Sequence, residues 1–174
     1  MKVIRKYDVP LAFYIFDVKD HAQIKPKILN DIAKLGVNPV TDNGQLIANT
    51  DWHLPRETHR EYITHIYDTM QDVCRQVNEI GEDVDGIKVD NYWFQQYAPH
   101  NYHGWHIHGM SVYSCVYYVD TDEATPRTSF KMLGSEFEVE AEEGQILVFP
   151  SFLLHASKPN TSSKTKTVIA FNLG

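Results

Sequence analysis

The 174-residue sequence predicts a mostly β protein of the α+β class, with an N-terminal helical layer packed outside a sandwich or barrel. Two observations predict this class. Residues before about Gly81 show helical periodicity, whereas the chain after Gly86 consists of short strand patterns separated by turn residues. Helices that precede a barrel usually cover its outer face. We therefore expect one domain over 1–174, with 1–85 as mainly helical support and 86–174 as the barrel core.

The first predicted elements are an edge strand at Leu11–Phe16 and a helix that begins after Asp20 and runs to about Leu35. Asp20 is a suitable N-cap and Gly36 a suitable stop. Pro26 fits this helix only if it lies in the first turn. The buried stripe is expected at Ile24, Ile28, Ile32 and Leu35.

A turn-rich loop is predicted from Asn38 to Pro55, with Asn43-Gly44 as a turn, followed by a second helix over about Glu57–Glu79. The loop is either a lid over a substrate or a plain connection. Apolar residues recur in the helix at steps of three and four, which describes one buried face. This face consists of Tyr62, Ile63, Ile66, Met70, Val73 and Val77.

The second half of the chain supplies the strands of the predicted barrel. They are expected near Gly86–Tyr97, Trp105–His108, Val112–Val119, Thr128–Met132, Glu136–Val139, Gln145–Phe149 and Thr165–Leu173.

The composition excludes several classes of protein. The net charge is −7 and the 16 Lys and Arg residues are scattered, which argues against a nucleic-acid partner. No apolar stretch approaches the ~18 residues of a membrane span, and the start of the chain does not have the pattern of a signal peptide. Two cysteines without a CxxC motif favour a reduced, cytoplasmic setting, although the sequence also allows one disulfide between them. Nothing in the sequence indicates the oligomeric state.

The histidines indicate where the chemistry lies. Four of the nine fall in the stretch HNYHGWHIH. On a strand, His106 and His108 point to the same side and can grip one metal ion. His155 is the candidate for a third ligand, because it is the only histidine after His108 and it follows a strand pattern.

The other histidines are assigned to surfaces, since a lone histidine is more often exposed or hydrogen-bonded than a ligand. His100 and His103 lie in an apparent loop and are expected to face solvent, with His103 as the reserve ligand. The remaining four surface histidines are His21, His53, His59 and His65.

Three stretches resemble a known family: HIHGMSVYSCVYYV, EEGQILVFPSFLLHASKPN and KTVIAFN. They resemble the 2-oxoglutarate and Fe(II)-dependent dioxygenases, in particular a compact bacterial and phage family, from about Trp93 to Asn172. The segment Ser114–Val119 is also similar, more distantly, to the second core strand of prolyl hydroxylases. Gly109, Cys115 and Lys166 stand where the compact family has Pro, Gly and Arg.

The resemblance implies a double-stranded β-helix of the jelly-roll or cupin type. It also implies an Fe(II) cofactor, 2-oxoglutarate as cosubstrate and ascorbate as an optional reductant. The implied activity is hydroxylation with release of succinate and CO2. The substrate would be a small molecule or a peptide, with peptidyl proline as one candidate. His106 and His155 match the two histidine ligands of the family, and His108 takes the position of its carboxylate ligand.

Four further residues match positions that bind the cosubstrate. Lys166 matches the basic residue that holds the distal carboxylate, with Lys164 as the alternative. Tyr118 and Ser114 match contacts of prolyl hydroxylases, and Tyr97 is a weaker match. Strand alternation agrees with this match. One face of the last strand carries the smaller set of residues and would leave room for a ligand: Lys166, Val168, Ala170 and Asn172. The other face carries Thr167, Ile169, Phe171 and Leu173.

Two other functions stay open on the sequence. Three histidines without a carboxylate also suit Zn(II), so a cupin-like metalloenzyme that does not use 2-oxoglutarate is one alternative. A non-catalytic binding barrel is the other. The aromatic residues Trp93, Tyr102, Trp105 and Tyr113 either line an entrance or form the barrel wall.

Overall fold

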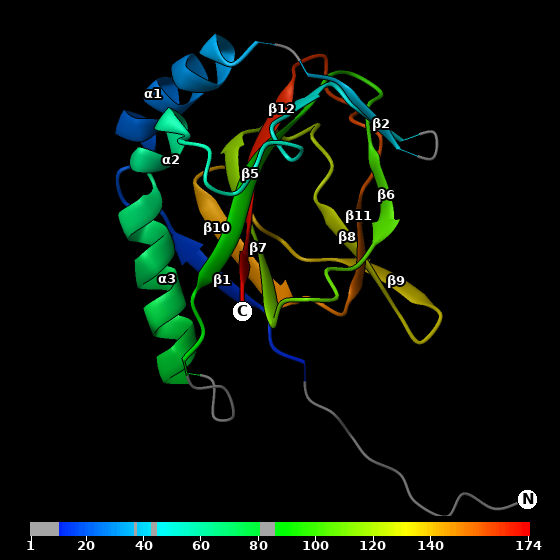
Figure 1. Cartoon of the computed structure of the whole chain (residues 1–174). Helices are drawn as coiled ribbons and strands as arrows, with labels where there is room; N and C mark the ends of the chain where they lie inside the picture. Colours follow the sequence, from blue (N-terminus) through cyan, green and yellow to red (C-terminus); the bar gives the residue numbers. More distant parts are fainter. Residues whose placement is uncertain (1–10, 37, 43–44, 81–85) are drawn as a thin grey trace, which may run out of the picture.

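Two antiparallel sheets face each other, and helices cover the outer side of the larger one (Figure 1). The computed structural model describes residues 11–36, 38–42, 45–80 and 86–174. The predicted class, mostly β with a helical layer, is confirmed. None of the helices in the described part of the chain is long and apolar enough to span a membrane.

The larger sheet has the order β1-β10-β7-β12-β5-β4, and all of its neighbours are antiparallel. Its strands are β1 (Tyr14–Asp17), β10 (Gln145–Pro150), β7 (Tyr113–Asp120), β12 (Lys166–Leu173), β5 (Val89–Tyr97) and β4 (Asn49–Thr50). The smaller sheet has the order β6-β11-β8-β9. Its strands are β6 (His103–His106), β11 (Leu154–Ser157), β8 (Thr128–Met132) and β9 (Ser135–Glu138). The two sheets are separate hydrogen-bonded units.

The eight predicted strands are all present to within a few residues, and two differences after residue 86 affect the site. The structure contains a strand, β11, that was not predicted as such. Strand β6 ends at His106 rather than His108, because the His108 amide donates to the Ser151 carbonyl at 3.0 Å instead of continuing the ladder. His108 therefore lies on the loop after the strand.

The predicted loop over 38–55 is wrong in part. It contains a hairpin of β2 (Val40–Asp42) and β3 (Gln45–Ile47), and then β4, which extends the large sheet next to β5. The predicted turn at Asn43-Gly44 lies outside the described residues. Short runs of two or three strand residues leave too little periodicity to be recognised in a sequence.

The first helix, α1 (His21–Lys34), has the predicted bounds, and Gly36 follows it with a positive φ of 78°. Asp20 precedes the helix but makes no capping hydrogen bond through its side chain. Pro26 lies beyond the first turn, contrary to the prediction. Proline has no N–H, so the Ala22 carbonyl loses its helical hydrogen-bond partner. The position is tolerated because both Ala22 and Pro26 are exposed to water. Of the predicted stripe, Ile28 and Ile32 are fully buried, Ile24 is half-buried and Leu35 is exposed.

The second predicted helix is divided into α2 (Glu61–Thr64) and α3 (Tyr67–Ile80). The break lies at His65, whose ring reaches across to Asp31 of α1 at 2.9 Å, and the Ile66 amide bonds the Ile63 carbonyl in a tighter turn. The predicted buried face is nevertheless confirmed, since all six of its members are buried.

The helices pack on the outward face of the large sheet and form the larger of two hydrophobic clusters with it. The fully buried members contributed by the sheet are Phe94, Tyr117, Val119, Ile146, Val148, Ile169, Phe171 and Leu173. A smaller cluster lies between the two sheets, around Leu147 and Phe149 of β10 and Phe130 of β8. Both cysteines, Cys74 and Cys115, are buried free thiols, so they do not form the disulfide that the sequence allowed.

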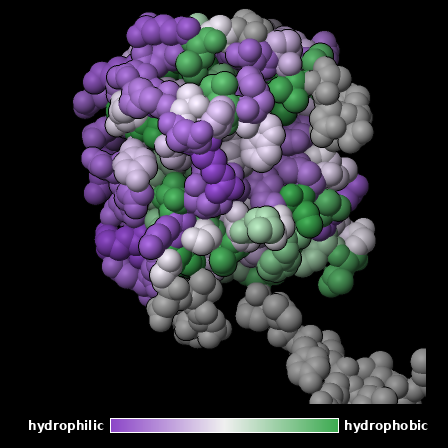
Figure 2. Space-filling model, in the orientation of Figure 1, coloured by the Kyte–Doolittle hydropathy of each residue, from purple (hydrophilic) through white to green (hydrophobic). Residues whose placement is uncertain are grey.

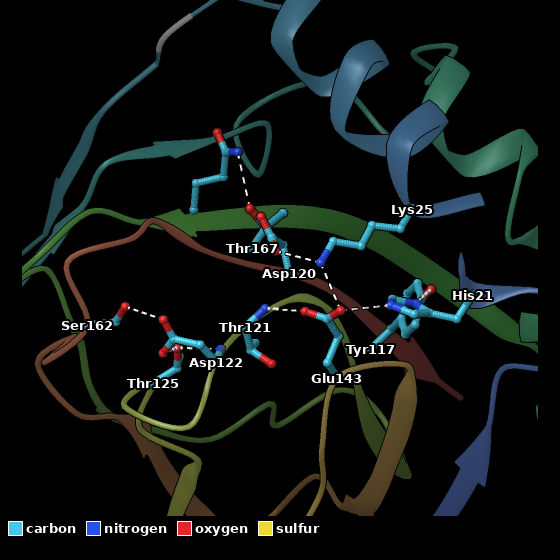
Figure 3. A network of polar contacts seen from close by, with 11 residues as sticks. His21, Lys25, Tyr117, Asp120, Thr121, Asp122, Thr125, Glu143, Ser162 and Thr167 are labelled. Carbon is cyan, nitrogen blue, oxygen red and sulfur yellow. Dashed lines mark hydrogen bonds and ion pairs between the residues drawn. The ribbon is translucent and has the colours of Figure 1, made fainter. Parts of the chain in front are cut away.

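A polar network joins α1 to the ends of β7 and β10 (Figure 3). Lys25 forms ion pairs with Asp120 at 2.7 Å and Glu143 at 2.8 Å. His21 shares a hydrogen bond of 2.6 Å with the Tyr117 hydroxyl and also contacts Glu143. The network is partly exposed, so we interpret it as the polar rim of the helix–sheet interface rather than a reactive site.

Candidate metal centre

The three histidines predicted as ligands lie together between the two sheets. His106 is the last residue of β6, and His155 on β11 is its direct partner in the ladder. The His108 ring comes back from the following loop to lie 5.2 Å from that of His106 and 5.1 Å from that of His155, measured between centroids. One ligand atom from each ring lies within 4.8 Å of the others, so the group can hold one metal ion.

Hydrogen bonds select the nitrogen that each ring offers. Nδ1 of His106 lies 2.8 Å from the Gly104 carbonyl, and Nδ1 of His155 lies 2.8 Å from the Leu153 carbonyl. A carbonyl only accepts, so both Nδ1 atoms carry the proton and Nε2 keeps the lone pair. Nδ1 of His108 is held in the same way by the Asn172 side-chain oxygen at 2.7 Å. All three Nε2 atoms are thus free to bind a metal.

Burial keeps these rings neutral. It lowers the pKa of His106 to about 4 and that of His155 to about 3, since desolvation disfavours the imidazolium. The same cause lowers the pKa of His108. A neutral imidazole is the form that ligates, so the site is prepared for a metal without releasing protons at neutral pH.

His108 has the most elaborate support. Ser114 lies 2.9 Å from its Nδ1, donates to Asn172 at 3.2 Å and shares a further hydrogen bond of 3.0 Å with Ser151. Asn172 was predicted to face the cavity but not to orient a histidine. Ser114 was predicted as a cosubstrate contact, whereas its observed contacts hold His108.

A fourth histidine belongs to the site. His103 was expected to face solvent, which is wrong: its ring stacks on that of His106 with centroids 3.9 Å apart and planes 20° apart. Burial lowers its pKa to about 3. It does not belong to the group that can hold a metal. The reason for the error is the early start of β6, which places residue 103 on the strand instead of a loop.

The remaining histidines are divided between two environments. His53, His59 and His100 are exposed as expected. His21 and His65 are half-buried and hydrogen-bonded to other elements, so their assignment to the surface was wrong.

Two hollows meet at the histidines. The inner one is a cavity of about 40 Å³, and its lining includes His103, all three candidate ligands, Ser114 and Lys166. None of the described residues that line it is acidic. The outer one has about 200 Å³ and is bounded by apolar residues that include Trp52, Trp93 and Ile107. Both share His103, His106 and His108, so the candidate metal site lies between the inner cavity, which contains Lys166, and the outer groove.

Lys166 is a buried cation in the inner cavity. Its Nζ donates to the Pro126 carbonyl at 2.6 Å and to Ser157 Oγ at 3.2 Å, and the rings of Tyr97 and Tyr118 flank it at 5.7 and 5.8 Å. Burial lowers the pKa of Lys166 to about 7, opposed by the field of Glu138. Lys164, the alternative anchor, is exposed.

The two predicted tyrosines are buried beside this lysine. The Tyr97 hydroxyl donates to Gln95 at 2.7 Å and its ring lines the inner cavity, while the Tyr118 hydroxyl bonds Thr128 at 2.7 Å. Gln95, Thr128 and the half-buried Ser157 were not singled out from the sequence. The alternation of β5, which places Gln95 on the same face as Tyr97, was the signal for the first of them.

The four aromatic residues that the sequence offered as the lining of an entrance lie in different parts of the structure. Trp93 lines both hollows and its buried indole nitrogen makes no hydrogen bond among the described residues. Trp105 packs under the ammonium of Lys131, and Tyr113 packs against Tyr14. Tyr102 donates its amide to the Leu46 carbonyl. Only Trp93 of the four lines either hollow.

Neither a protein-family model nor a curated protein matches the chain by sequence. Solved structures do match it in fold. A viral collagen prolyl hydroxylase from Paramecium bursaria Chlorella virus 1, in complex with 2-oxoglutarate, is 16% identical, with a TM-score of 0.65 over 92% of this chain and 94% of that one. A 2-oxoglutarate-Fe(II) oxygenase family protein from Burkholderia pseudomallei is 12% identical, with a TM-score of 0.71 over 93% and 85%.

A third match is a prolyl hydroxylase from Trichoplax adhaerens in complex with a peptide fragment of the hypoxia-inducible factor oxygen degradation domain. It is 15% identical, with a TM-score of 0.66 over 92% of this chain and 82% of that one. The similarity in fold to 2-oxoglutarate-Fe(II) oxygenases and prolyl hydroxylases agrees with the resemblance found in the sequence motifs.

Proposed function

We propose that this protein is an Fe(II)- and 2-oxoglutarate-dependent oxygenase that hydroxylates its substrate and releases succinate and CO2. One observation carries the proposal: a group able to hold a metal and a buried lysine share a cavity that none of the described acidic residues lines. We further propose that 1–174 is one domain and that its two sheets are the halves of a double-stranded β-helix.

The donor set suits a ferrous ion. Three neutral imidazoles bind Fe(II) or Zn(II) and leave the charge of the ion uncompensated. Together with the Lys166 ammonium, the loaded cavity would carry a formal charge of about +3, and a dicarboxylate such as 2-oxoglutarate complements it. The inner cavity is small, so binding of this acid requires the lining side chains to move apart.

The bound ion would be chelated by 2-oxoglutarate and would activate dioxygen, and hydroxylation depends on both. The chain supplies the positions. His106, His108 and His155 would hold the ion, and Asn172 would keep His108 in the ligating tautomer. The apolar walls Val116, Phe149 and Val168 would keep water from the reaction.

Lys166 would bind the distal carboxylate of the cosubstrate. An ammonium group has three donors, and Lys166 uses two, so one stays available for the acid. Tyr97, Tyr118 and Ser114 would surround the same molecule, as the motifs imply. In this arrangement the lysine orients the acid and the histidines orient the metal that it chelates.

The outer groove would bind the primary substrate. Its walls include Trp52, which is 57% exposed, and Ile107, which is 52% exposed. Figure 2 shows further hydrophobic residues on the lower right of the molecule, whereas the side of the helices is mostly hydrophilic. A peptide segment with an apolar side chain, for which peptidyl proline is one candidate, suits such a groove.

Anaerobic titration of the Fe(II)-loaded protein with 2-oxoglutarate tests the proposal. We expect the visible charge-transfer band of the chelate, and after admission of oxygen in the presence of ascorbate we expect succinate. Absence of both the band and any turnover would reject the function.

A matched pair of lysine variants tests the anchor. Lys166→Met should weaken 2-oxoglutarate binding by at least about 30-fold, because it removes the buried charge that pairs with the acid. Lys164→Met, which removes an exposed lysine two residues away, should leave binding unchanged. Equal effects of the two substitutions would contradict the role of Lys166.

The three-histidine donor set also favours a second candidate, a cupin-like metalloenzyme that does not use 2-oxoglutarate, because no carboxylate of the described part of the chain completes the site. In that case the metal would bind, but neither lysine substitution would affect activity. The same pair of variants therefore distinguishes the two enzymes.

A further inference from the structure

His103 contacts the site differently from the three histidines beside it. Its ring is stacked on His106, and its Nδ1 lies 3.3 Å from the Gln95 side-chain nitrogen. The Nδ1 atoms of the other three face oxygen acceptors. This contrast determines which nitrogen of His103 carries its proton.

The orientation of Gln95 follows from its contact with Tyr97. The Tyr97 hydroxyl donates to the Gln95 Oε1 atom at 2.7 Å. Because this contact engages the oxygen of the side-chain amide, the amino group of the same amide faces His103.

With its oxygen turned to Tyr97, Gln95 presents its amino group to His103. Nδ1 of His103 must accept this hydrogen bond, and a neutral imidazole that accepts at Nδ1 carries its proton at Nε2. His103 is therefore held in the opposite tautomer to His106, His108 and His155. Its Nε2 then has no lone pair to offer a metal. Independently of the tautomer, His103 does not belong to the group whose ligand atoms all lie within 4.8 Å of one another.

We propose that His103 is a positioning residue that donates a hydrogen bond from Nε2 to an oxygen of the acid chelated at the metal. Its ring lines both the inner cavity and the outer groove, next to the candidate ligand His106. A fixed N–H beside the ion would orient a carboxylate without competing for the coordination sphere. This inference rests on the proposed function for the identity of the acid.

The tautomer can be observed directly. In the Zn(II)-loaded protein labelled with ¹⁵N-histidine, two-bond ¹H–¹⁵N spectra should show His103 protonated at Nε2 and the three candidate ligands protonated at Nδ1. Gln95→Leu should remove the preference of His103 for Nε2. Protonation of His103 at Nδ1, or an unchanged pattern in Gln95→Leu, would overturn the inference.

Binding of 2-oxoglutarate to the Zn(II)-loaded protein, measured by calorimetry, tests the donor role. His103→Phe keeps a ring to stack on His106 and should weaken binding about tenfold, with the affinity for Zn(II) unchanged. His103→Gln, which can place an N–H near the position of Nε2, should restore most of the loss. Equal affinities in the wild type and His103→Phe would overturn the proposal.

The same titration separates this inference from the proposed function. If the wild type does not bind 2-oxoglutarate, the proposed function and the donor role both fail. If the wild type binds 2-oxoglutarate and His103→Phe binds it with the same affinity, the proposed function stands and the donor role of His103 is rejected.

Discussion

The two faces of β12 have the same burial and opposite chemistry. On the outward face Ile169, Phe171 and Leu173 are fully buried against the helical layer. On the inward face Lys166 and Asn172 are 2% and 5% exposed, yet both are polar. Asn172 is hydrogen-bonded to His108, and Lys166 lines the cavity that the histidines also line.

This difference shows what each face contributes. Apolar burial on the outward face stabilises the fold, at roughly 25 cal/mol per Å². Burial of polar groups on the inward face lowers stability unless each group is hydrogen-bonded. The presence of buried polar side chains there therefore indicates a functional site and not a contribution to the stability of the fold. Substitutions on the two faces should therefore have separable effects.

The largest effect is expected on the outward face. Phe171→Ala should reduce the free energy of unfolding of the metal-free protein by about 3–5 kcal/mol, because it opens a cavity in the core. Urea unfolding measures this change, with the exposed Leu133→Ala as a control expected to stay within about 0.5 kcal/mol. The folded Phe171→Ala protein should bind Zn(II) as tightly as the wild type; a marked loss would show that the two faces are not separable.

On the inward face, His155→Ala should weaken Zn(II) or Fe(II) binding by at least about 100-fold, since it removes one of three candidate ligands. Competition with a chromophoric chelator gives the affinity. His59→Ala is the matched control, because His59 is exposed and its ring is hydrogen-bonded to Glu61, which lies outside the site. Similar metal affinities in both variants would contradict the assignment of the site.

The smallest effect is a pH dependence that belongs to the inward face alone. The pKa of Lys166 in the free cavity is about 7, below the usual 10.5. Binding of an acid requires the ammonium, so above pH 7 binding takes up a proton and the affinity for 2-oxoglutarate should fall by up to about tenfold per pH unit. Below pH 7 Lys166 should cause no further change.

Calorimetry of the Zn(II)-loaded protein between pH 6.5 and 8.5 (roughly, the range that brackets this pKa) checks the dependence. Lys166→Arg should make the affinity independent of pH, because guanidinium stays charged. A persistent decline in this variant would assign the titration to another group.

The outward face was largely predictable from the sequence, and the inward face only in part. Periodicity identified the buried face of α3 and the alternation of β12, because apolar burial repeats with the geometry of the element. The spacing of the histidines and the family motifs, rather than periodicity, predicted His106, His108 and His155 as one group, and the three lie together in the structure. The break at His65 and the position of His108 beyond β6 depend on single long-range hydrogen bonds, to Asp31 and Ser151, which leave no pattern in the sequence.

The same limit applies to the supporting residues of the site. Gln95 and Ser157 are ordinary polar residues on their strands, and their roles follow only from contacts with Tyr97 and Lys166. The error over His103 has a related cause, since two residues at the start of β6 decide whether it belongs to a loop or to the sheet.

An anaerobic crystal structure with Fe(II) and 2-oxoglutarate tests the central claim most directly. We expect one ion bound by the Nε2 atoms of His106, His108 and His155, chelated by the keto acid, with the far carboxylate on the Lys166 ammonium. An ion bound elsewhere, or an acid whose far carboxylate lies away from Lys166, would contradict the account.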